Sequence, residues 1–344
     1  MERNFATFTK NIRKLCITFA DDMKKLLVII NPVSGTTNKN GLEDVISRRL
    51  DDIYDLDIRY TTAKGDATRF SIEAVKEKYF GVIAAGGDGT VNETAKALKD
   101  TDVAFGILPV GSGNGLARHL SIPMDVKDAL EIIAKENIEN LDYCTVNGTP
   151  FFCTFGMGFD ASVSWKFAQQ KRRGLMTYLK STIEEYLNYK TAEYVIEANG
   201  NTLTENAFCV ACCNASQYGN NAYIAPGADM TDGLLDVTII HAGSMLRTAV
   251  VGIDLMSGTI KNNILIESFK TNHLTIRRKE SGPAHIDGEP LIMGEELDIF
   301  CHHGGLHTFI PTETEEFRPV ITPLKSRWTE MITKLKRLFE EDLL

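Results

Sequence analysis

The stretch GGDGTVNETAKAL, residues 86–98, decides the fold, because it joins an apolar run to a segment with helical spacing. The preceding residues, FGVIAA (80–85), predict a buried strand that ends in the glycine turn and continues as a helix. Glycines let backbone amides approach an anion closely, and a helix N-terminus attracts negative charge. The turn therefore predicts a phosphate site, with a plain turn capped by Asp88 as the alternative. An acid at the centre of a phosphate site needs its own explanation.

The same order of strand, polar loop and helix recurs on both sides of this stretch. The apolar runs LLVII (26–30), LDIRY (56–60) and VAFGILPV (103–110) lead into the loops NPVSG (31–35), TTAKGDA (61–67) and GSGNG (111–115). This alternation predicts an α/β domain whose parallel sheet is covered by helices on both faces. Ligands bind such sheets at the carboxyl ends of the strands, so we expect these loops to converge on one nucleotide site.

The pattern changes after residue 140, where short strands replace the strand–helix alternation. Asn147-Gly148 and Asn199-Gly200 are hairpin signals, and further strands are expected at 234–240, 273–278 and 296–300. Helical segments at 171–190 and 244–256 interrupt these strands. We therefore expect a β-rich second domain, either a sandwich or an open barrel.

Four segments follow from these patterns. Residues 1–22 are expected to be an N-terminal extension, because Met23 opens a stretch that itself resembles a natural start. Residues 23–140 would form the nucleotide-binding domain and residues 141–311 the β-rich domain. Residues 312–344 contain a helix with one apolar face, which we expect to dock on the first domain. A helix lying on a membrane surface is the alternative.

Composition and charge narrow the classes of function. The chain of 344 residues is 43% hydrophobic and 24% charged, as in soluble globular proteins, and its formal net charge is −9. That charge argues against nucleic acid as a partner, because neutralising phosphates needs a concentrated basic surface. No apolar run approaches the roughly 20 residues that span a bilayer. The seven cysteines are expected to be reduced thiols, and CHHGGLH (301–307) is expected to be a surface turn rather than a zinc site.

Three motifs together carry a family resemblance. NPVSG, GGDGTVNE and LPVGSGNGLAR, in this order and spacing, resemble the lipid kinase family that includes bacterial diacylglycerol kinases and eukaryotic sphingosine and ceramide kinases. The resemblance covers residues 24–311. It implies a nucleotide domain of the 6-phosphofructokinase and NAD kinase type with a β-sandwich second domain. It also implies transfer of the γ-phosphate of ATP to a lipid hydroxyl, with Mg²⁺ as cofactor and a place in phospholipid biosynthesis.

The resemblance further implies which residues contact ATP, and all of them lie in the loops after the first-domain strands or at the helix start that follows. They are Asn31, Pro32, Ser34, Gly35, Thr36, Thr37, Thr61, Gly86, Gly87, Gly89, Thr90, Asn92, Glu93, Ser112 and Asn114.

A metal site is implied in the second domain. GADMTDGLLDV (227–237) resembles a family segment that holds a structural magnesium ion, which maps to Asp229, Asp232 and the carbonyl of Leu234. The residues agree in part, because carboxylate and carbonyl oxygens are the ligands that magnesium prefers. An ordinary Asp-Gly turn between strands is the alternative.

The catalytic base is implied by a third segment. AHIDGEPL (284–291) resembles the family's D-G-E motif, so Asp287 or Glu289 would accept the proton of the lipid hydroxyl. Transfer of phosphate to an alcohol is helped by such a carboxylate. A hairpin turn explains Asp-Gly equally well. In sphingosine kinases the aspartate of GGDG is implicated instead, which makes Asp88 a rival base or a partner acting through magnesium.

One departure from the bacterial pattern bears on the acceptor. Bacterial diacylglycerol kinases usually have an aspartate where this chain has Gly115, and GSGN is closer to sphingosine kinases. Diacylglycerol and a sphingoid or ceramide-like lipid therefore both stay open as acceptors. The alternatives to a lipid kinase are a NAD kinase and a nucleotide-binding regulator without transfer activity. We expect a cytoplasmic protein held peripherally at the inner membrane face, with a homodimer as an open possibility and no nucleic-acid partner.

Overall fold

A computed structural model describes residues 23–35, 41–168, 189 and 191–313. The expected N-terminal extension, the C-terminal helix, Thr36, Thr37 and nearly all of the helix expected at 171–190 lie outside the described residues. Within the described part of the chain, no helix is long and apolar enough to cross a membrane.

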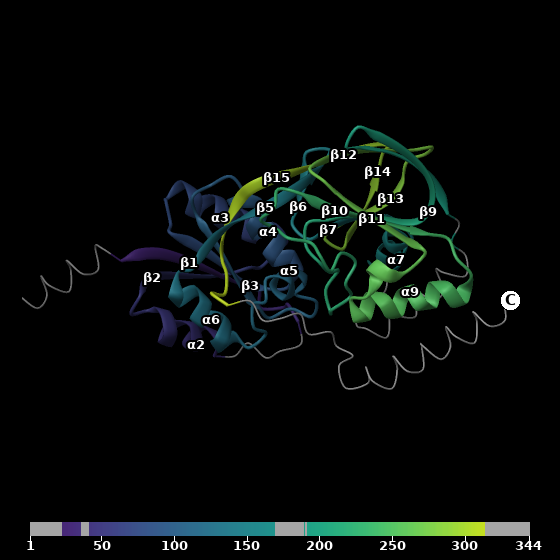
Figure 1. The fold of residues 1–344 in the computed structure, drawn as a ribbon. Helices are drawn as coiled ribbons and strands as arrows, with labels where there is room; N and C mark the ends of the chain where they lie inside the picture. Colours follow the sequence, from purple (N-terminus) through teal and green to yellow (C-terminus); the bar gives the residue numbers. More distant parts are fainter. Residues whose placement is uncertain (1–22, 36–40, 169–188, 190, 314–344) are drawn as a thin grey trace, which may run out of the picture.

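The first part of the chain is the predicted α/β layer structure (Figure 1). Its strands run parallel in the order β2-β1-β3-β4, and α2 packs on α6 while α3 packs on α4. The inner strands are covered on both faces, which is why the run 26–30 is apolar throughout and entirely buried. The strands are β1 (Lys24–Ile30), β2 (Tyr54–Tyr60), β3 (Gly81–Gly86) and β4 (Ala104–Pro109), and the helices are α2 (Leu42–Leu50), α3 (Asp66–Lys76), α4 (Asp88–Leu98), α5 (Gly115–His119) and α6 (Val126–Lys135).

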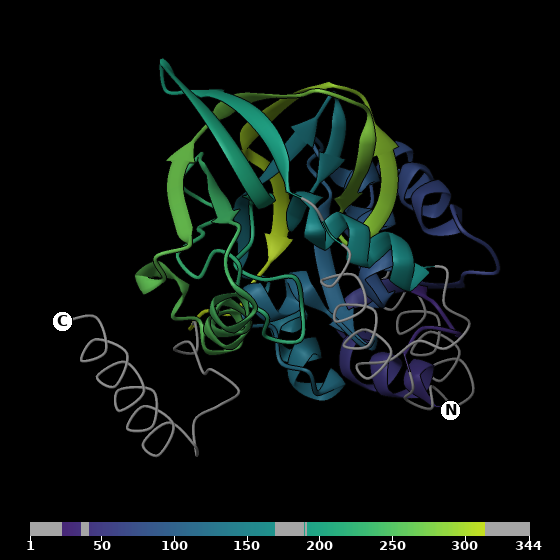
Figure 2. The same cartoon turned by 90° about the vertical axis from the view of Figure 1, so that its right-hand side faces the viewer.

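The second part is β-rich and mainly antiparallel, as expected. Its strands curve into an arch with helices α7 (Phe159–Ala168) and α9 (Met245–Ser257) beneath it (Figure 2). The strands are β5 (Ile138–Val146), β6 (Thr149–Phe151), β7 (Thr154–Gly158), β8 (Ala192–Ala198), β9 (Asn201–Cys213), β10 (Leu235–His241), β11 (Ile266–Thr271), β12 (His273–Arg278), β13 (Gly282–Ile286), β14 (Glu289–Met293) and β15 (Glu296–Phe309), and η1 (Ile260–Asn262) is a short 3₁₀ helix.

Both predicted Asn-Gly hairpins are confirmed. Asn147 and Gly148 have φ of 47° and 76°, and Asn199 and Gly200 have φ of 52° and 75°. Two successive positive φ values give the turn whose twist matches that of the flanking strands, and Asn-Gly adopts it at low cost.

Strand β15 joins the two parts into one continuous sheet. It pairs with β5 and β12, and at its end Thr308 lies beside Phe105 of β4, with Phe309 buried in the first core. The surface turn expected at 301–307 is wrong, because these residues continue β15 through a bulge in which Gly304 has φ 66°. The boundary predicted near residue 140 falls inside β5, so the domain division stays a prediction.

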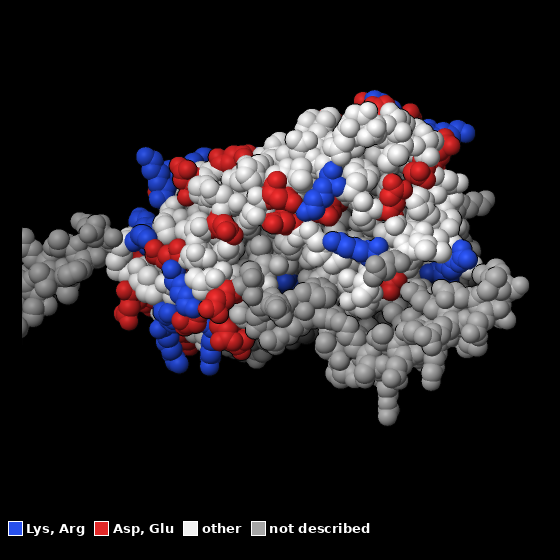
Figure 3. Space-filling model, in the orientation of Figure 1, with Lys and Arg blue, Asp and Glu red and all other residues white. Residues whose placement is uncertain are grey.

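The surface is unevenly charged on the face drawn in Figure 3. Basic and acidic side chains are mixed over the first part, whereas fewer of them lie over the middle of the second part.

Candidate active site

The glycine loops after β1, β3 and β4 touch backbone to backbone. A Cβ atom added to Gly111 would lie 2.3 Å from the Cα of Gly87, and one added to Gly35 would lie 2.2 Å from the carbonyl oxygen of Val110. Contacts this short exclude any side chain, so glycine is required at Gly35 and Gly111. The convergence of these loops at one edge of the sheet, expected from the sequence, is therefore present.

Polar side chains of the first loop hold it against helix α4. The Asn31 side-chain amide donates to the Thr90 hydroxyl at 2.9 Å, and the Asn31 backbone N–H donates to the Ala85 carbonyl at 3.0 Å. The Ser34 hydroxyl donates to the Asn31 carbonyl at 3.1 Å. The NPVSG loop is thus fixed to the start of the helix that follows GGDG.

The hydrogen bonds of Asp88 explain why an acid can stand at the centre of the GGDG turn. Its carboxylate accepts hydrogen bonds from the backbone N–H groups of Asn114, at 3.0 Å, and Gly115, at 2.7 Å. The Asn114 side chain closes the same loop, with its oxygen accepting from the Gly111 N–H at 3.1 Å. The negative charge of Asp88 therefore meets backbone donors of the neighbouring glycine loop.

The loop after β2 is ordered by two other acids. Asp66 accepts from the backbone N–H groups of Thr62, at 2.8 Å, and Ala63, at 2.9 Å, and the bonds from Thr62, Ala63 and Arg69 hold the pKa of Asp66 well below its ordinary value. Glu93 accepts from the Gly65 backbone N–H at 2.9 Å. These acids act on the protein backbone, and Thr61 is held by its N–H bond to the Ile30 carbonyl at 2.9 Å.

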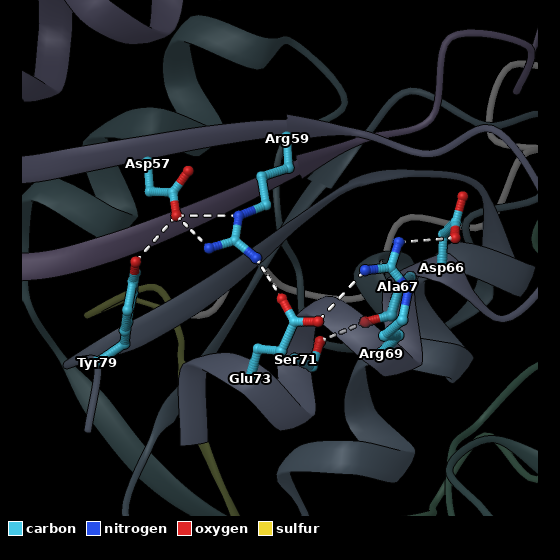
Figure 4. Close-up of polar contacts among 8 residues, drawn as sticks. All are labelled: Asp57, Arg59, Asp66, Ala67, Arg69, Ser71, Glu73 and Tyr79. Carbon is cyan, nitrogen blue, oxygen red and sulfur yellow. Dashed lines mark hydrogen bonds and ion pairs between the residues drawn. The ribbon is translucent and has the colours of Figure 1, made fainter. Parts of the chain in front are cut away.

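An ion-pair network joins the strand and the helix that flank that loop (Figure 4). Arg59 donates to Asp57 and to Glu73, each at 2.7 Å, so that strand β2 and helix α3 are joined on either side of the loop. The Tyr79 hydroxyl donates to Asp57 at 2.9 Å, and burial together with this bond raises the pKa of Tyr79 to about 12. Sequence patterns gave no sign of this network, because its contacts depend on how strand β2 packs beside helix α3 and Tyr79.

Asp287 connects the second part of the chain to the first. It occupies the left-handed region, with φ 49°, at the turn between β13 and β14. Its carboxylate accepts from three backbone N–H groups, those of Phe152, Cys153 and Thr154, at 3.0, 2.8 and 3.0 Å, and from the side-chain amide of Asn92. Burial raises the pKa of Asp287, and the three backbone bonds oppose that rise. Through these hydrogen bonds, the Asp287 carboxylate holds the β13–β14 hairpin against helix α4.

Glu289 lies two residues further on, in an open position. Its carboxylate is exposed, and its two oxygens lie 3.0 and 3.3 Å from the Lys64 ammonium nitrogen in the loop after β2. Among the three predicted catalytic acids, Glu289 is the one whose carboxylate accepts no backbone hydrogen bond within the described residues. The structure thus brings 287–289 against the loop that carries Lys64.

The predicted ATP contacts divide into exposed and enclosed positions. Pro32, Gly35, Gly89 and Ser112 are exposed on the loop surfaces, and a Cβ added to Gly89 would meet no atom within 4 Å. Asn92 and Glu93 instead hold other segments in place. The remaining described positions are buried or partly buried: Asn31, Ser34, Thr61, Gly86, Gly87, Thr90 and Asn114.

The predicted magnesium ligands have protein partners. Asp232 accepts from the Leu234 backbone N–H at 2.9 Å and from the Lys270 ammonium at 2.6 Å, while Asp229 accepts from the Thr231 hydroxyl at 2.7 Å. Across the described ranges, no group of three or more His, Cys, Asp or Glu is arranged to hold a metal ion. With an ammonium group already on Asp232, this donor set does not fit a further cation as it stands.

Two polar clusters in the second part were not predicted from the sequence. Asp142, fully buried, accepts from the backbone N–H of Gly304 at 2.7 Å and lies 2.8 Å from Nδ1 of His303. Asp160 lies 3.0 Å from Nε2 of His285 and accepts from the Tyr218 hydroxyl at 2.9 Å. For the Asp160 cluster, the sequence offered one signal, which was the position of His285 two residues before the predicted catalytic Asp287.

Two family models match the chain in succession. The diacylglycerol kinase catalytic domain matches residues 25–146, and the YegS C-terminal NAD kinase beta sandwich-like domain matches residues 154–296. The chain belongs to the diacylglycerol kinase-like lipid kinase family. The family resemblance inferred from the motifs is therefore confirmed.

Named relatives agree with this assignment. The chain is 27% identical over 302 residues to "Diacylglycerol kinase" of Bacillus subtilis, with 86% of this chain and 99% of that protein covered. It is 28% identical over 272 residues to "Probable lipid kinase YegS-like" of Pectobacterium atrosepticum, with 77% and 89% covered.

Solved structures confirm the fold class of this chain. A diacylglycerol kinase from Bacillus anthracis strain Sterne matches with a TM-score of 0.67 at 21% identity, over 86% of this chain and 99% of that one. Yeast NADH kinase, solved in complex with NADH, matches with a TM-score of 0.51 at 12% identity, over 88% of each chain. The likeness to both at such identities concerns the fold alone.

Proposed function

We propose that this chain is a lipid kinase that transfers the γ-phosphate of ATP to the hydroxyl of a lipid, either diacylglycerol or a sphingoid or ceramide-like lipid. The observation that carries this proposal is the joining of helix α4, which follows the GGDG turn, and of the loop after β2 to the 287–289 hairpin, by Asn92 and Lys64 respectively. A phosphate-binding edge and a carboxylate that can serve an acceptor hydroxyl then face one another. The names of the curated relatives support a lipid as the acceptor.

The nucleotide site is proposed at the three touching glycine loops. Backbone N–H groups at the start of α4 and the surfaces of Gly89 and Ser112 would receive the polyphosphate, since a helix N-terminus favours anions. Thr36 and Thr37 stay part of the proposed site and lie outside the described residues. Magnesium entering with ATP would neutralise charge on the transferred phosphate. No lysine is needed inside the GGDG turn, because its amides and the helix start supply the positive potential.

Glu289 is the proposed proton acceptor. The lipid hydroxyl gives its proton to the Glu289 carboxylate, the hydroxyl oxygen forms a bond to the γ-phosphorus, and the bond to the bridging β,γ-oxygen breaks, so that ADP leaves. Lys64, whose ammonium nitrogen lies 3.0 Å from the Glu289 carboxylate, would orient this carboxylate. Asp287 and Asp88 would be positioning residues, because backbone donors engage both carboxylates.

The location is proposed to be the cytoplasmic side of the inner membrane, with peripheral attachment. Two large apolar side chains favour contact with lipid near the hairpin: Ile292 on β14 is 55% exposed and Trp165 on α7, which packs on β14, is 38% exposed. A homodimer remains part of the proposal and is tested by the molar mass in solution.

A transfer assay separates the candidate functions. Labelled ATP is incubated with the enzyme and with diacylglycerol, sphingosine or ceramide in vesicles, or with NAD in solution. Labelled lipid phosphate is the expected product. Labelled NADP with no lipid product would instead identify a NAD kinase, the activity suggested by the fold shared with yeast NADH kinase. Saturable ATP binding without any product would identify a regulator, and vesicle flotation of the same samples tests the membrane attachment.

A further inference from the structure

The loop 229–234 is the segment that the family resemblance assigns to a structural magnesium ion, yet a lysine occupies its acidic side. The Lys270 ammonium nitrogen lies 2.6 Å from the Asp232 carboxylate and 3.4 Å from the Asp236 carboxylate. The other oxygen of Asp232 accepts from the Leu234 backbone N–H at 2.9 Å. Both oxygens of Asp232 therefore have a donor within the protein.

The sheet fixes Lys270 in this position. Strands β10 and β11 are antiparallel, and their register places Lys270 directly opposite Asp236. Directly opposite residues on a sheet have Cβ atoms about 4.5–5.5 Å apart, so the lysine stem starts beside the acids. The three side chains are also partly shielded, with exposed fractions of 35% for Lys270, 27% for Asp232 and 14% for Asp236. The contact thus follows from the backbone register and does not depend on a freely rotating surface lysine.

The opposite side of the loop is held by Asp142 of β5. Its carboxylate accepts from the Gly233 backbone N–H at 2.7 Å, and its own N–H donates to the Met230 carbonyl at 2.6 Å. This carboxylate is fully buried and also accepts from Gly304. Protein groups therefore hold both the backbone and the acidic side chains of the loop.

We infer that Lys270 takes the place of a structural divalent cation in this chain, so that the second part of the fold forms without magnesium. One ammonium group lies between the Asp232 and Asp236 carboxylates and offsets part of the negative charge that would otherwise attract a metal, and it repels a second cation from the same oxygens. Magnesium would then be required only as the partner of ATP, and not for the stability of the second part of the fold. This inference goes beyond the proposed function and does not depend on which acceptor is phosphorylated.

Thermal unfolding of the full chain without nucleotide tests the inference. The melting temperature is measured in EDTA and in excess MgCl₂, and the wild-type values are expected to coincide. In Lys270→Met the acids lose their counter-charge, so the melting temperature in EDTA is expected to fall by about 3 °C or more and to recover partly with MgCl₂. Lys270→Arg keeps the charge and should behave as wild type, while Lys76→Met, at an exposed helical site, controls for loss of a lysine.

Specific results would overturn the inference. A wild-type melting temperature that drops in EDTA and returns with MgCl₂ would show that magnesium still belongs to this loop. Stoichiometric Mg²⁺ binding to the nucleotide-free wild type in calorimetry would show the same. If Lys270→Met fails to fold, the wild-type comparison alone decides. Because no ATP or lipid is present, the outcome is independent of whether the proposed kinase activity is found.

Discussion

The carboxylate of Asp88 accepts a hydrogen bond from the backbone N–H of Gly115 at 2.7 Å. The acid of one glycine loop therefore organises the next loop, with the Asn114 backbone N–H donating to the same carboxylate at 3.0 Å. An acid at this position is compatible with a phosphate site, because its charge is directed at protein donors.

Removing the Asp88 carboxylate should weaken nucleotide binding. Asp88→Ala deletes two hydrogen bonds to a charged acceptor, each worth about 1.5–3 kcal/mol, so we expect ATP affinity to fall at least tenfold. Asp88→Asn keeps one acceptor oxygen and should give an intermediate value in calorimetric titrations with ATP. Normal ATP affinity with no turnover in Asp88→Ala would instead indicate that Asp88 acts on the reacting groups.

Substitution by alanine distinguishes loop glycines that pack against protein backbone from a loop glycine with open space beside it. Gly111→Ala would bring a Cβ within 2.3 Å of the Gly87 Cα, so we expect a lower melting temperature and loss of ATP binding. Gly89→Ala meets no protein atom within 4 Å, so the fold should be retained while a bound phosphate is obstructed. Gly252→Ala, in α9, is the matched control with neither effect. Unchanged ATP binding in Gly89→Ala would remove Gly89 from the proposed site.

Turnover should depend on Glu289 more strongly than ATP binding does. Glu289→Gln keeps the shape of the side chain and removes the base, so kcat is expected to fall by a factor of about 10²–10⁴, with the ATP dissociation constant nearly unchanged. Lys64→Met removes the ion pair but leaves the carboxylate, and should cost much less. Full turnover in Glu289→Gln would return the role of base to Asp287 or Asp88.

Asp287 is expected to act on stability as well as on activity. Asp287→Ala leaves the backbone N–H groups of Phe152, Cys153 and Thr154 without their acceptor, and each unsatisfied buried donor costs about 1–3 kcal/mol. Asp287→Asn retains an acceptor oxygen and should unfold at a higher denaturant concentration than Asp287→Ala. Equal unfolding midpoints for the two variants in urea would contradict a positioning role.

His119 should make the protein less stable as the pH falls from 6.5 to 4. Burial lowers the pKa of His119 to about 4 against an opposing charge on Asp229, and its Nδ1 accepts from the Ser216 backbone N–H at 3.1 Å, which requires the unprotonated nitrogen. Between about pH 6.5 and pH 4 the unfolded chain binds a proton that the folded chain does not. The free energy of unfolding therefore declines through that window and is fully retained above it.

The matched variant for this prediction is His119→Gln. Because the glutamine side chain does not titrate, the stability difference between the two proteins should change between about pH 7 and pH 4.5 in urea unfolding. A constant difference across this range would show that His119 does not cause the decline.

Much of the fold could be predicted from local patterns. The fully apolar run 26–30 becomes a strand covered on both faces, and Asn147-Gly148 becomes a hairpin with two positive φ values. Both signals work because burial and turn geometry depend on a few neighbouring residues. The surface turn predicted for CHHGGLH was wrong because the local pattern did not decide the structure there. Its glycines suit a turn, but pairing with the distant strand β5 keeps 301–307 within β15.

The sequence by itself determined the fold class, the glycine loops and the family, because each of these depends on residues that are close together along the chain. Only the tertiary structure decided that Asp88 meets Gly115, that Asn92 meets Asp287, and that Lys270 lies opposite Asp236. The partners in these contacts are distant in sequence, and strand pairing and helix packing bring them together. Neither partner's local pattern carries information about the other, so the roles of these acids became visible only in the folded chain.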